Sequence, residues 1–406
     1  MDKRGFYTKI WDELAREKSM VFLAGPRQTG KTTLAKIISR SYKNNLYFNW
    51  DILRDRTRFL ANPHFFEALE RTDPSTPLVI FDEIHKYREW KNYMKGVYDQ
   101  FHDRYQFLVS GSGRLDIYQK GGDSLAGRYY LFHLWPFTIA ELGRCNTHIK
   151  EFLKNPLWIS MEKNRELGRI WQQLSTLSGF PEPYLSERMT TYRRWSGSYA
   201  RQLIREDIRD ITDIKSIVDV ENLYLLLPSK IGSPLSAQSL ANDLHVSYNT
   251  IRNWLSIFER FFLIFSIAPW TKSIARAIQK ERKVYLWDTP RIKEAPARFE
   301  NMVAIELWRA VTSWNDLGYG CFTLHFIKNR ERQEVDFLIA NDNEPFLLIE
   351  AKMSNTEPSA ALKAFQRFLN IPAVQLTSEG ATYRMFSNGN QSILAVPSYQ
   401  WLSLLP

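Results

Sequence analysis

Two glycines, a lysine and a threonine in residues 25–32 have the spacing of a phosphate-binding loop. The segment reads Gly-Pro-Arg-Gln-Thr-Gly-Lys-Thr, a complete G-x-x-x-x-G-K-[ST] motif, between an apolar run and a helical pattern. Glycines let backbone N–H groups close around phosphate oxygens, and the following helix presents its positive end to them. We expect Lys31 to reach the β- and γ-phosphates of ATP and Thr32 to bind Mg²⁺. The cofactor-binding residues are predicted to be Gly25, Pro26, Arg27, Gln28, Thr29, Gly30, Lys31, Thr32 and Thr33.

Two carboxylates, Asp82 and Glu83, follow the apolar residues 78–81. Buried parallel strands read as continuous apolar runs, and their carboxyl ends form the ligand edge of the sheet. We expect Asp82 to hold the Mg²⁺ through its water shell and Glu83 to orient or deprotonate the attacking water. In the plainer alternatives, 25–32 is only a glycine-bearing turn and the two acids only cap the next helix.

Two polar loops follow later apolar runs and can complete the same machinery. Ser112, or else Ser110, follows the apolar residues 107–109 and is a candidate sensor of the γ-phosphate. Arg128 precedes the apolar run 129–134 and is the first candidate for an arginine that stabilises charge on the transferring phosphoryl group, with Arg114 the second. Acting on another chain, Arg128 would require a homo-oligomer. The alternative for either arginine is a solvated surface charge.

A second group of acids lies in the C-terminal third. Asp336 begins one apolar run, and Glu350 and Lys352 end the next, separated by the turn residues 341–345. Residues two apart on a strand share a face, so Glu350 and Lys352 point the same way, and the hairpin brings Asp336 beside them. Two carboxylates and a backbone carbonyl are suitable ligands for Mg²⁺ or Mn²⁺, and Glu300 on the preceding helix can complete the ligand set. Lys352 can then activate a water molecule. The alternative for each acid is a salt bridge.

The elements that carry these residues form four successive regions. Strand and helix signals alternate over residues 1–142, which predicts an α/β domain with a mostly parallel sheet closed by Trp135-Pro136-Phe137. Residues 143–215 read as helices, with residues 179–183 as a loop between them. We expect a further small domain over residues 216–290 and the acid-bearing α/β domain over residues 291–406.

Residues 236–258 have the pattern of a helix-turn-helix. The first helix is capped by Ser236 and the second by Ser247, with a turn at 245–246. We expect Ile251, Leu255 and Phe258 to face inward, and the side chains Tyr248, Asn249, Arg252 and Asn253 to face outward as in a DNA-recognition helix. The apolar segment after it and residues 283–288 predict the strands of a wing. The alternative is a packing or oligomerisation module.

Charge and composition favour a nucleic-acid partner. The 406 residues carry a formal net charge of +10, which favours an acidic polymer, nucleic acid before anionic membrane. A basic stretch follows the second helix and would contact phosphates; it contains Lys272, Arg276, Lys280, Arg282, Lys283, Arg291, Lys293 and Arg298. We expect a soluble cytoplasmic protein without a membrane partner. The two cysteines lack the spacing of metal ligands, the start of the chain lacks a secretory h-region, and no apolar run is long enough to span a bilayer.

With these motifs in view, the chain resembles the AAA-type ATP-binding proteins of bacteria and archaea that end in a C-terminal domain of unknown function. The likeness covers nearly the whole length, including Gly111-Ser112, residues 125–128, residues 179–182 and Phe299-Glu300-Asn301. It implies an extended P-loop ATPase of the AAA+ superfamily with a winged helix and a restriction-endonuclease-type PD-(D/E)xK fold. Asp336, Glu350 and Lys352 match that nuclease pattern and Glu300 its helix acid, although Glu334-Val335 stands where a proline often precedes the aspartate.

We therefore predict Mg²⁺-dependent ATP binding and hydrolysis, coupled to DNA binding and to metal-dependent DNA cleavage. Lys31, Thr32, Asp82 and Glu83 would carry the ATP chemistry. Two alternatives stay open. One is a nucleotide-switched DNA- or protein-binding module whose nuclease fold is inactive, and the other is a chaperone-like or signalling ATPase that never touches DNA.

Overall fold

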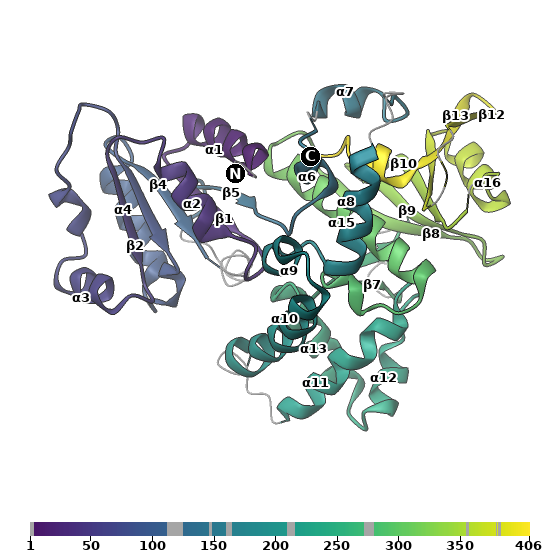
Figure 1. Ribbon diagram of the computed structural model, residues 1–406, viewed down its shortest axis with the longest axis horizontal. Helices are drawn as coiled ribbons and strands as arrows, with labels where there is room; N and C mark the ends of the chain where they lie inside the picture. The colour runs from purple at the N-terminus through teal and green to yellow at the C-terminus, as the bar shows by residue number, and fades with distance from the viewer. Residues whose placement is uncertain are drawn as a thin grey trace. The chain divides into compact units, whose positions relative to one another are not determined.

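The computed structural model describes residues 4–111, 125–145, 148–159, 165–208, 216–271, 280–354, 357–378, 380 and 383–406. The chain separates into two compact units, Met1–Pro136 and Phe137–Pro406, and the proline of the Trp-Pro-Phe segment ends the first. Figure 1 shows the first unit in purple and blue and the second in teal to yellow. The predicted four-part division stays a prediction.

The first unit is built on a five-stranded parallel sheet in the order β2-β3-β4-β1-β5. Its strands are short and largely apolar, as strands covered on both faces must be. They are β1 (Met20–Ala24), β2 (Asn45–Asn49), β3 (Leu78–Asp82), β4 (Gln106–Ser110) and β5 (Tyr130–His133). The predicted parallel α/β sheet is therefore present.

Helices cover both faces of this sheet. Helices α1 (Gly5–Glu17) and α2 (Lys31–Ser39) contact one face, and α3 (Leu53–Ala61) and α4 (Trp90–Phe101) pack with the aromatic core on the other. Phe22, Phe48, Phe81 and Phe107 all enter that aromatic core. Since all five strands are parallel, their carboxyl ends, where the polar motifs lie, meet at one edge.

The second unit begins with helices and continues through the predicted helix-turn-helix. The helices are α6 (Ile139–Leu142), α7 (Ile149–Lys154), α8 (Arg165–Leu177), α9 (Pro181–Ser186), α10 (Met189–Gln202), α11 (Ile217–Leu226), α12 (Ala237–Asp243) and α13 (Tyr248–Arg260). The expected loop at 179–183 is only partly correct, because Pro181 and Pro183 lie in the first turn of α9, where proline removes no needed donor.

An eight-stranded mixed sheet forms the rest of the unit, in the order β12-β13-β11-β10-β9-β8-β6-β7. Helix α15 (Ala295–Asp316) contacts strands of this sheet, and α16 (Ala360–Leu369) joins the core that includes Val335, Leu348 and Ile393. The short helix α17 (Ser398–Leu402) contacts β11 and β13. The strands are β6 (Ile264–Pro269), β7 (Lys283–Leu286), β8 (Phe322–Lys328), β9 (Glu334–Asn341), β10 (Glu344–Lys352), β11 (Ala373–Thr377), β12 (Arg384–Asn388) and β13 (Gln391–Pro397).

The strands expected to form a separate wing are part of this sheet. β6 and β7 pair antiparallel as a hairpin would, but Ala268 and Pro269 of β6 also pair parallel with His325 and Phe326 of β8. A division of the chain at residue 290 therefore cuts through one sheet. Among the helices that the structure describes, none combines the length and the apolar character needed to cross a membrane.

Candidate functional site

The phosphate-binding loop lies between β1 and α2, at the carboxyl edge of the parallel sheet. Gly25 has φ 140°, and a Cβ there would lie 2.2 Å from the carbonyl oxygen of Leu134, so only glycine fits. Gly30 has φ 95° and occupies the N-cap of α2, which lets the loop turn directly into the helix. The loop therefore has the backbone that the motif requires, with the positive end of α2 behind it.

Lys31 closes over the loop. Its Nζ donates hydrogen bonds to the carbonyl oxygens of Gly25 at 3.0 Å and Pro26 at 2.7 Å, and Thr29 Oγ1 donates to the same Pro26 oxygen at 2.9 Å. The lysine is buried, so its ammonium is held inside the loop. Phosphate oxygens carry more negative charge than these carbonyl groups and are stronger acceptors for an ammonium.

Asp82 is the centre of a network of hydroxyl groups. Its Oδ2 accepts hydrogen bonds from Thr32 Oγ1 and from the phenol of Tyr47, both at 2.7 Å, and its Oδ1 accepts one from Ser110 Oγ at 2.5 Å. Burial and the carboxylate beside it raise the pKa of Tyr47, so the phenol keeps its proton and donates. Asp82 and Thr32, the predicted Mg²⁺ ligands, are thus in direct contact.

Glu83 follows in a left-handed backbone conformation, with φ 60°. Its Oε2 lies 3.3 Å from Lys86 Nζ and 3.6 Å from His85 Nε2, and Lys86 in turn lies 2.5 Å from Asp51. About 20% of the Glu83 side chain is exposed, whereas Asp82 is buried. The neighbouring acids therefore have different surroundings: Asp82 is fixed among hydroxyl groups, and Glu83 is partly exposed beside Lys86.

The structure places Arg128 away from the phosphate loop. β5 runs parallel to β1, with Tyr130 opposite Val21 and His133 opposite Ala24, so Arg128 lies at the amino edge of the sheet and the loop at the carboxyl edge. Its guanidinium forms hydrogen bonds to Asp99 in α4 at 2.6 and 3.2 Å. A role in phosphoryl transfer would need a second chain, and that role stays a prediction. Ser112 and Arg114 lie outside the described residues.

Two residues that the sequence motifs missed contact this site. The buried Arg4 donates to the carbonyl oxygens of Thr29 at 2.5 Å and Trp135 at 3.1 Å and so braces the phosphate loop from outside it. Tyr47 ends up beside Asp82 because β2 and β3 pair in register, with Asn49 opposite Asp82. The only sequence signal for Tyr47 was its place near the end of an apolar run.

The C-terminal acids come together as the hairpin of β9 and β10 predicts. Asp342 and Asn343 have positive φ values of 50° and 66°, which is a two-residue turn, and Asp336 Oδ2 accepts a hydrogen bond from the backbone N–H of Ala351 at 2.8 Å. Glu350 Oε1 lies 3.1 Å from Lys352 Nζ and accepts a hydrogen bond from Ser359 Oγ at 2.8 Å. Asp336, Glu350 and Lys352 therefore lie close together.

A buried lysine from β7 enters the same cluster. Lys283 Nζ lies 2.8 Å from Glu334, 3.0 Å from Glu300 and 3.9 Å from Asp336, and the Tyr285 phenol also donates to Glu300 at 2.9 Å. Burial raises the pKa of Asp336 to about 7, and the charge of Glu300 adds to that rise while Lys283 opposes it. Burial opposes the charge on Lys283, but the three carboxylates outweigh it and raise its pKa.

These contacts bear on whether a divalent cation fits the cluster. Among the residues that the structure describes, no group of three or more histidine, cysteine, aspartate or glutamate side chains is arranged to hold a metal ion. The ammonium of Lys283 lies among Glu300, Glu334 and Asp336, where a cation shared by these acids would have to be. The residues present therefore do not fit the metal that the nuclease resemblance implies.

The helix-turn-helix has the capping that its sequence predicts. Ser236 accepts a hydrogen bond from the N–H of Ser239, and Ser247 accepts one from Thr250. The expected recognition residues Tyr248, Asn249, Arg252 and Asn253 are all exposed. The predicted inner face is shifted, because Trp254 and Ile257 are buried with Ile251 and Phe258 whereas Leu255 is half-buried.

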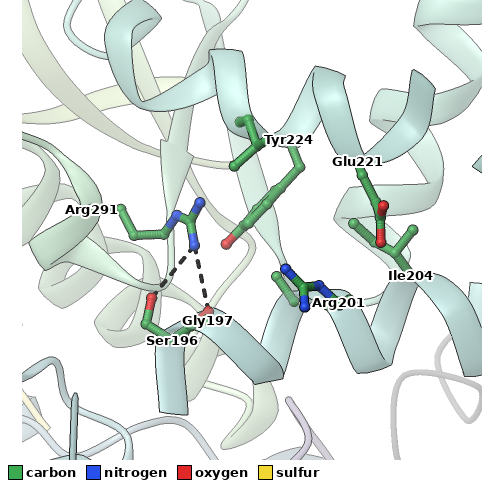
Figure 2. A pocket seen from close by; sticks show the side chains of 9 residues that line it. Ser196, Gly197, Arg201, Ile204, Glu221, Tyr224 and Arg291 are labelled. Carbon is green, nitrogen blue, oxygen red and sulfur yellow. Dashed lines mark hydrogen bonds between the residues drawn. The ribbon is translucent and has the colours of Figure 1, made fainter. Parts of the chain in front are cut away.

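The basic stretch is only partly a free surface. Lys280, Arg282 and Lys293 are exposed, but Lys283 is buried among acids, so phosphate contact by Lys283 is not supported. Arg291 lines a cavity of about 100 Å³ together with Tyr224 and Arg201. Figure 2 shows its guanidinium directed toward Ser196, and its Cζ lies 4.7 Å from the centre of the Tyr224 ring. Lys272 and Arg276 lie outside the described residues.

Comparison with protein families divides the chain into three matched segments. A family model described as an AAA domain matches residues 17–143. Two models of domains of unknown function, DUF8612 and DUF4143, match residues 169–290 and 297–399. The first match covers the phosphate loop, Asp82 and Glu83.

The similar curated proteins are described as uncharacterized. One from Methanocaldococcus jannaschii is 23% identical over an alignment of 401 residues, and the match covers 93% of this chain and 86% of that relative. One from Mycobacterium tuberculosis is 23% identical over 270 residues, 66% of this chain, and the match spans only 54% of that relative. Their names supply no activity.

Solved structures give weaker likenesses. A Walker-type ATPase of Pyrococcus abyssi aligns with a TM-score of 0.44 at 13% identity, over 71% of this chain and 95% of its own. The Hsp104–ADP complex of S. cerevisiae aligns with a TM-score of 0.31 at 12% identity, over 78% of this chain and 46% of its own. Neither score carries an argument about function. The family match and the parallel sheet together identify the N-terminal part of the chain as an AAA-type P-loop domain.

Proposed function

We propose that the protein is a Mg²⁺-dependent ATPase whose nucleotide state controls the binding of nucleic acid. The observation that supports hydrolysis most directly is the arrangement of Asp82 and Glu83. Asp82 is fixed against the hydroxyl of Thr32, while Glu83 is the next residue and its carboxylate is partly open to solvent. Adjacent acids with these two environments can divide metal binding and base catalysis between them.

Each group in the site has one task in this proposal. Backbone N–H groups of the phosphate loop and the ammonium of Lys31 bind the phosphates. Thr32 and Asp82 would hold Mg²⁺, which when bound neutralises charge on the phosphates. Glu83 accepts a proton from the attacking water, and Lys86, whose Nζ lies 3.3 Å from the Glu83 carboxylate, orients it.

ATP binding is tested first, with a fluorescent ATP analogue and a hydrolysis assay on the full chain. Lys31→Met should abolish binding, because the loop then lacks the cation that faces the phosphates. Lys43→Met in the same unit is the matched control, since the exposed Lys43 pairs with Asp73 outside the loop. Equal binding by wild type and Lys31→Met would remove the nucleotide site from the proposal.

The exposed residues of α13 support nucleic-acid binding. Tyr248, Asn249, Arg252 and Asn253 lie on the solvent side of a capped helix, and Lys280, Arg282 and Lys293 add positive charge to the same unit. Exposed positive charge gives affinity for phosphates, and a polar helix face supplies base contacts. If the nucleotide state controls DNA binding, duplex DNA should change the rate of ATP turnover. A rate that is the same with and without DNA favours a signalling or chaperone-like ATPase.

DNA cleavage by the C-terminal domain is the second candidate. The hairpin that joins Asp336, Glu350 and Lys352 favours it, and the ammonium of Lys283 beside Asp336 counts against it. The test uses labelled single-stranded, duplex and branched DNA with Mg²⁺ or Mn²⁺, with and without ATP. Cleavage that is lost in Asp336→Ala supports a nuclease. No cleavage by protein that still hydrolyses ATP supports the alternative of a nucleotide-switched module with an inactive nuclease fold.

A further inference from the structure

We infer that Lys283 is the built-in counter-ion of the carboxylate cluster formed by Glu300, Glu334 and Asp336, and that its ammonium excludes a divalent cation from that cluster. This inference is independent of the ATPase proposal, because it concerns the C-terminal sheet alone. It bears directly on which of the two C-terminal functions the chain can have.

The position of the ammonium carries the inference. Its nitrogen is 2.8 Å from a Glu334 oxygen and 3.0 Å from a Glu300 oxygen, and both are hydrogen-bonding distances. Mg²⁺ demands oxygen ligands at about 2.0–2.1 Å in near-octahedral geometry. An ion that shared these acids would lie within a few ångströms of the ammonium, and two cations so close in a buried site repel strongly.

The ammonium cannot easily leave. Only 1% of the Lys283 side chain is exposed. Its backbone pairs with Ile267 of β6 and with Pro234, and Nζ lies 5.5 Å from the centre of the Phe326 ring. Moving the side chain into solvent would therefore disturb the β6–β7 hairpin and leave buried carboxylates without their partner, which is costly in a site of this kind.

Charge in the cluster is already nearly balanced. Two more lysines reach its rim: Lys328 lies 2.9 Å from Glu334, and Lys352 lies 3.1 Å from Glu350. Counting the adjacent Glu350 with the three acids of the cluster, three ammonium groups therefore face four carboxylates. A divalent cation is not needed to offset the negative charge.

The ATP site provides a contrast within the same chain. Asp82 accepts its hydrogen bonds from the hydroxyl groups of Thr32, Tyr47 and Ser110. A hydroxyl oxygen has lone pairs that can bind a metal ion directly, whereas an ammonium has none. The two acidic sites therefore differ in the group that a metal would meet.

The experiment measures Mn²⁺ binding to the full chain without nucleotide, by the loss of the free-ion EPR signal. The proteins compared are wild type, Asp336→Asn, Lys283→Met, Lys328→Met and the double variant Lys283→Met/Asp336→Asn. Wild type and Asp336→Asn should bind Mn²⁺ alike, because the ATP site contributes equally to both. Lys283→Met should gain one site that binds Mn²⁺ at least ~10-fold more tightly, and the double variant should lose it. Lys328→Met removes a rim ammonium and should gain none.

A Mn²⁺ ion that wild type binds and Asp336→Asn loses would overturn the inference. That comparison does not depend on Lys283→Met, so the inference stays testable even if the lysine variant fails to fold. Circular dichroism of each variant shows whether it has folded. Equal gains in Lys283→Met and Lys328→Met would also overturn it, because general charge rather than the buried ammonium would then control binding.

Discussion

Thr32 Oγ1 donates a hydrogen bond to Asp82 Oδ2 at 2.7 Å, and this contact joins the first turn of α2 to the end of β3. The two residues are 50 positions apart in the sequence. Their contact requires β1 and β3 to end at the same edge, and the sheet order places β4 alone between these strands. The phosphate loop and the acidic pair are thereby held on one rigid support.

Replacing Glu83 by glutamine should separate binding from turnover. The amide keeps the shape of the side chain but cannot accept a proton from water, so turnover should fall at least ~100-fold while ATP affinity changes little. Phosphate release and ATP binding are measured on the same preparation. Glu89→Gln, at an exposed position, is the control. Unchanged turnover in Glu83→Gln would show that Glu83 is not the base.

Arg4→Ala should weaken ATP binding although Arg4 is not part of the sequence motif. The substitution removes two charge-assisted hydrogen bonds to the carbonyl oxygens of Thr29 and Trp135. Bonds of this kind contribute roughly 1.5–3 kcal/mol each when buried, so a loss of ~10-fold or more in affinity is expected through a loosened loop. Titration with a fluorescent ATP analogue measures the affinity, and Lys9→Ala, an exposed position in the helix that follows Arg4, is the control. Wild-type affinity in Arg4→Ala would show that the loop does not depend on this brace.

Asp288 should make the second unit less stable as the pH rises. The residue is fully buried beside Ser196 and Arg291, and burial raises its pKa from 3.8 to about 6. Below pH 3.8 the carboxyl is protonated in both the folded and the unfolded chain. Between pH 3.8 and 6 only the unfolded chain loses the proton readily, so the free energy of unfolding should fall across this window, by about 3 kcal/mol at most.

Asp288→Asn isolates that contribution, because asparagine is neutral at every pH and can still accept the hydrogen bond that Ser196 donates. Urea unfolding of wild type and variant is followed at several pH values from 4 to 7. The wild type should lose stability relative to Asp288→Asn as the pH rises through the window. Parallel curves would mean that the carboxyl titrates alike in both states.

Arg252→Ala should reduce DNA affinity if α13 contacts a duplex. The side chain is exposed on the front of the helix and partly covers the ring of Tyr248. If Arg252 contacts a phosphate, its loss should lower the slope of log K against log salt concentration by about 1. If it contacts a base, its loss should reduce the binding free energy by about 1–3 kcal/mol and relax specificity at one position of the site. Fluorescence anisotropy at several salt concentrations separates the two outcomes. Arg384→Ala, an exposed arginine on β12, is the control, and equal binding by all three proteins would argue against α13 as the DNA-contacting helix.

Strand pairing places two charged residues in surroundings that the sequence did not predict. Lys283 appeared in a run of basic residues and was expected at a phosphate-binding surface, but β7 pairs with β6 at the edge of the large sheet and points the side chain at acids from α15 and β9. Arg128 was expected to stabilise charge on the transferring phosphoryl group. Because β5 runs parallel to β1, Arg128 lies at the edge of the sheet opposite the phosphate loop. Neither outcome can be read from neighbouring residues in the chain.

The sequence by itself determined the parts of this protein that local chemistry controls. The phosphate loop needs its glycines within eight residues, an apolar run that ends in acids predicts a buried strand, and serine caps fix the starts of α12 and α13. Only the tertiary structure decided that Arg4 and Tyr47 join the proposed ATP site, that the strands of the predicted wing extend the C-terminal sheet, and that Lys283 lies within the acidic cluster. The physical reason is that strand order and register bring together residues whose separation along the chain carries no information about their distance in space.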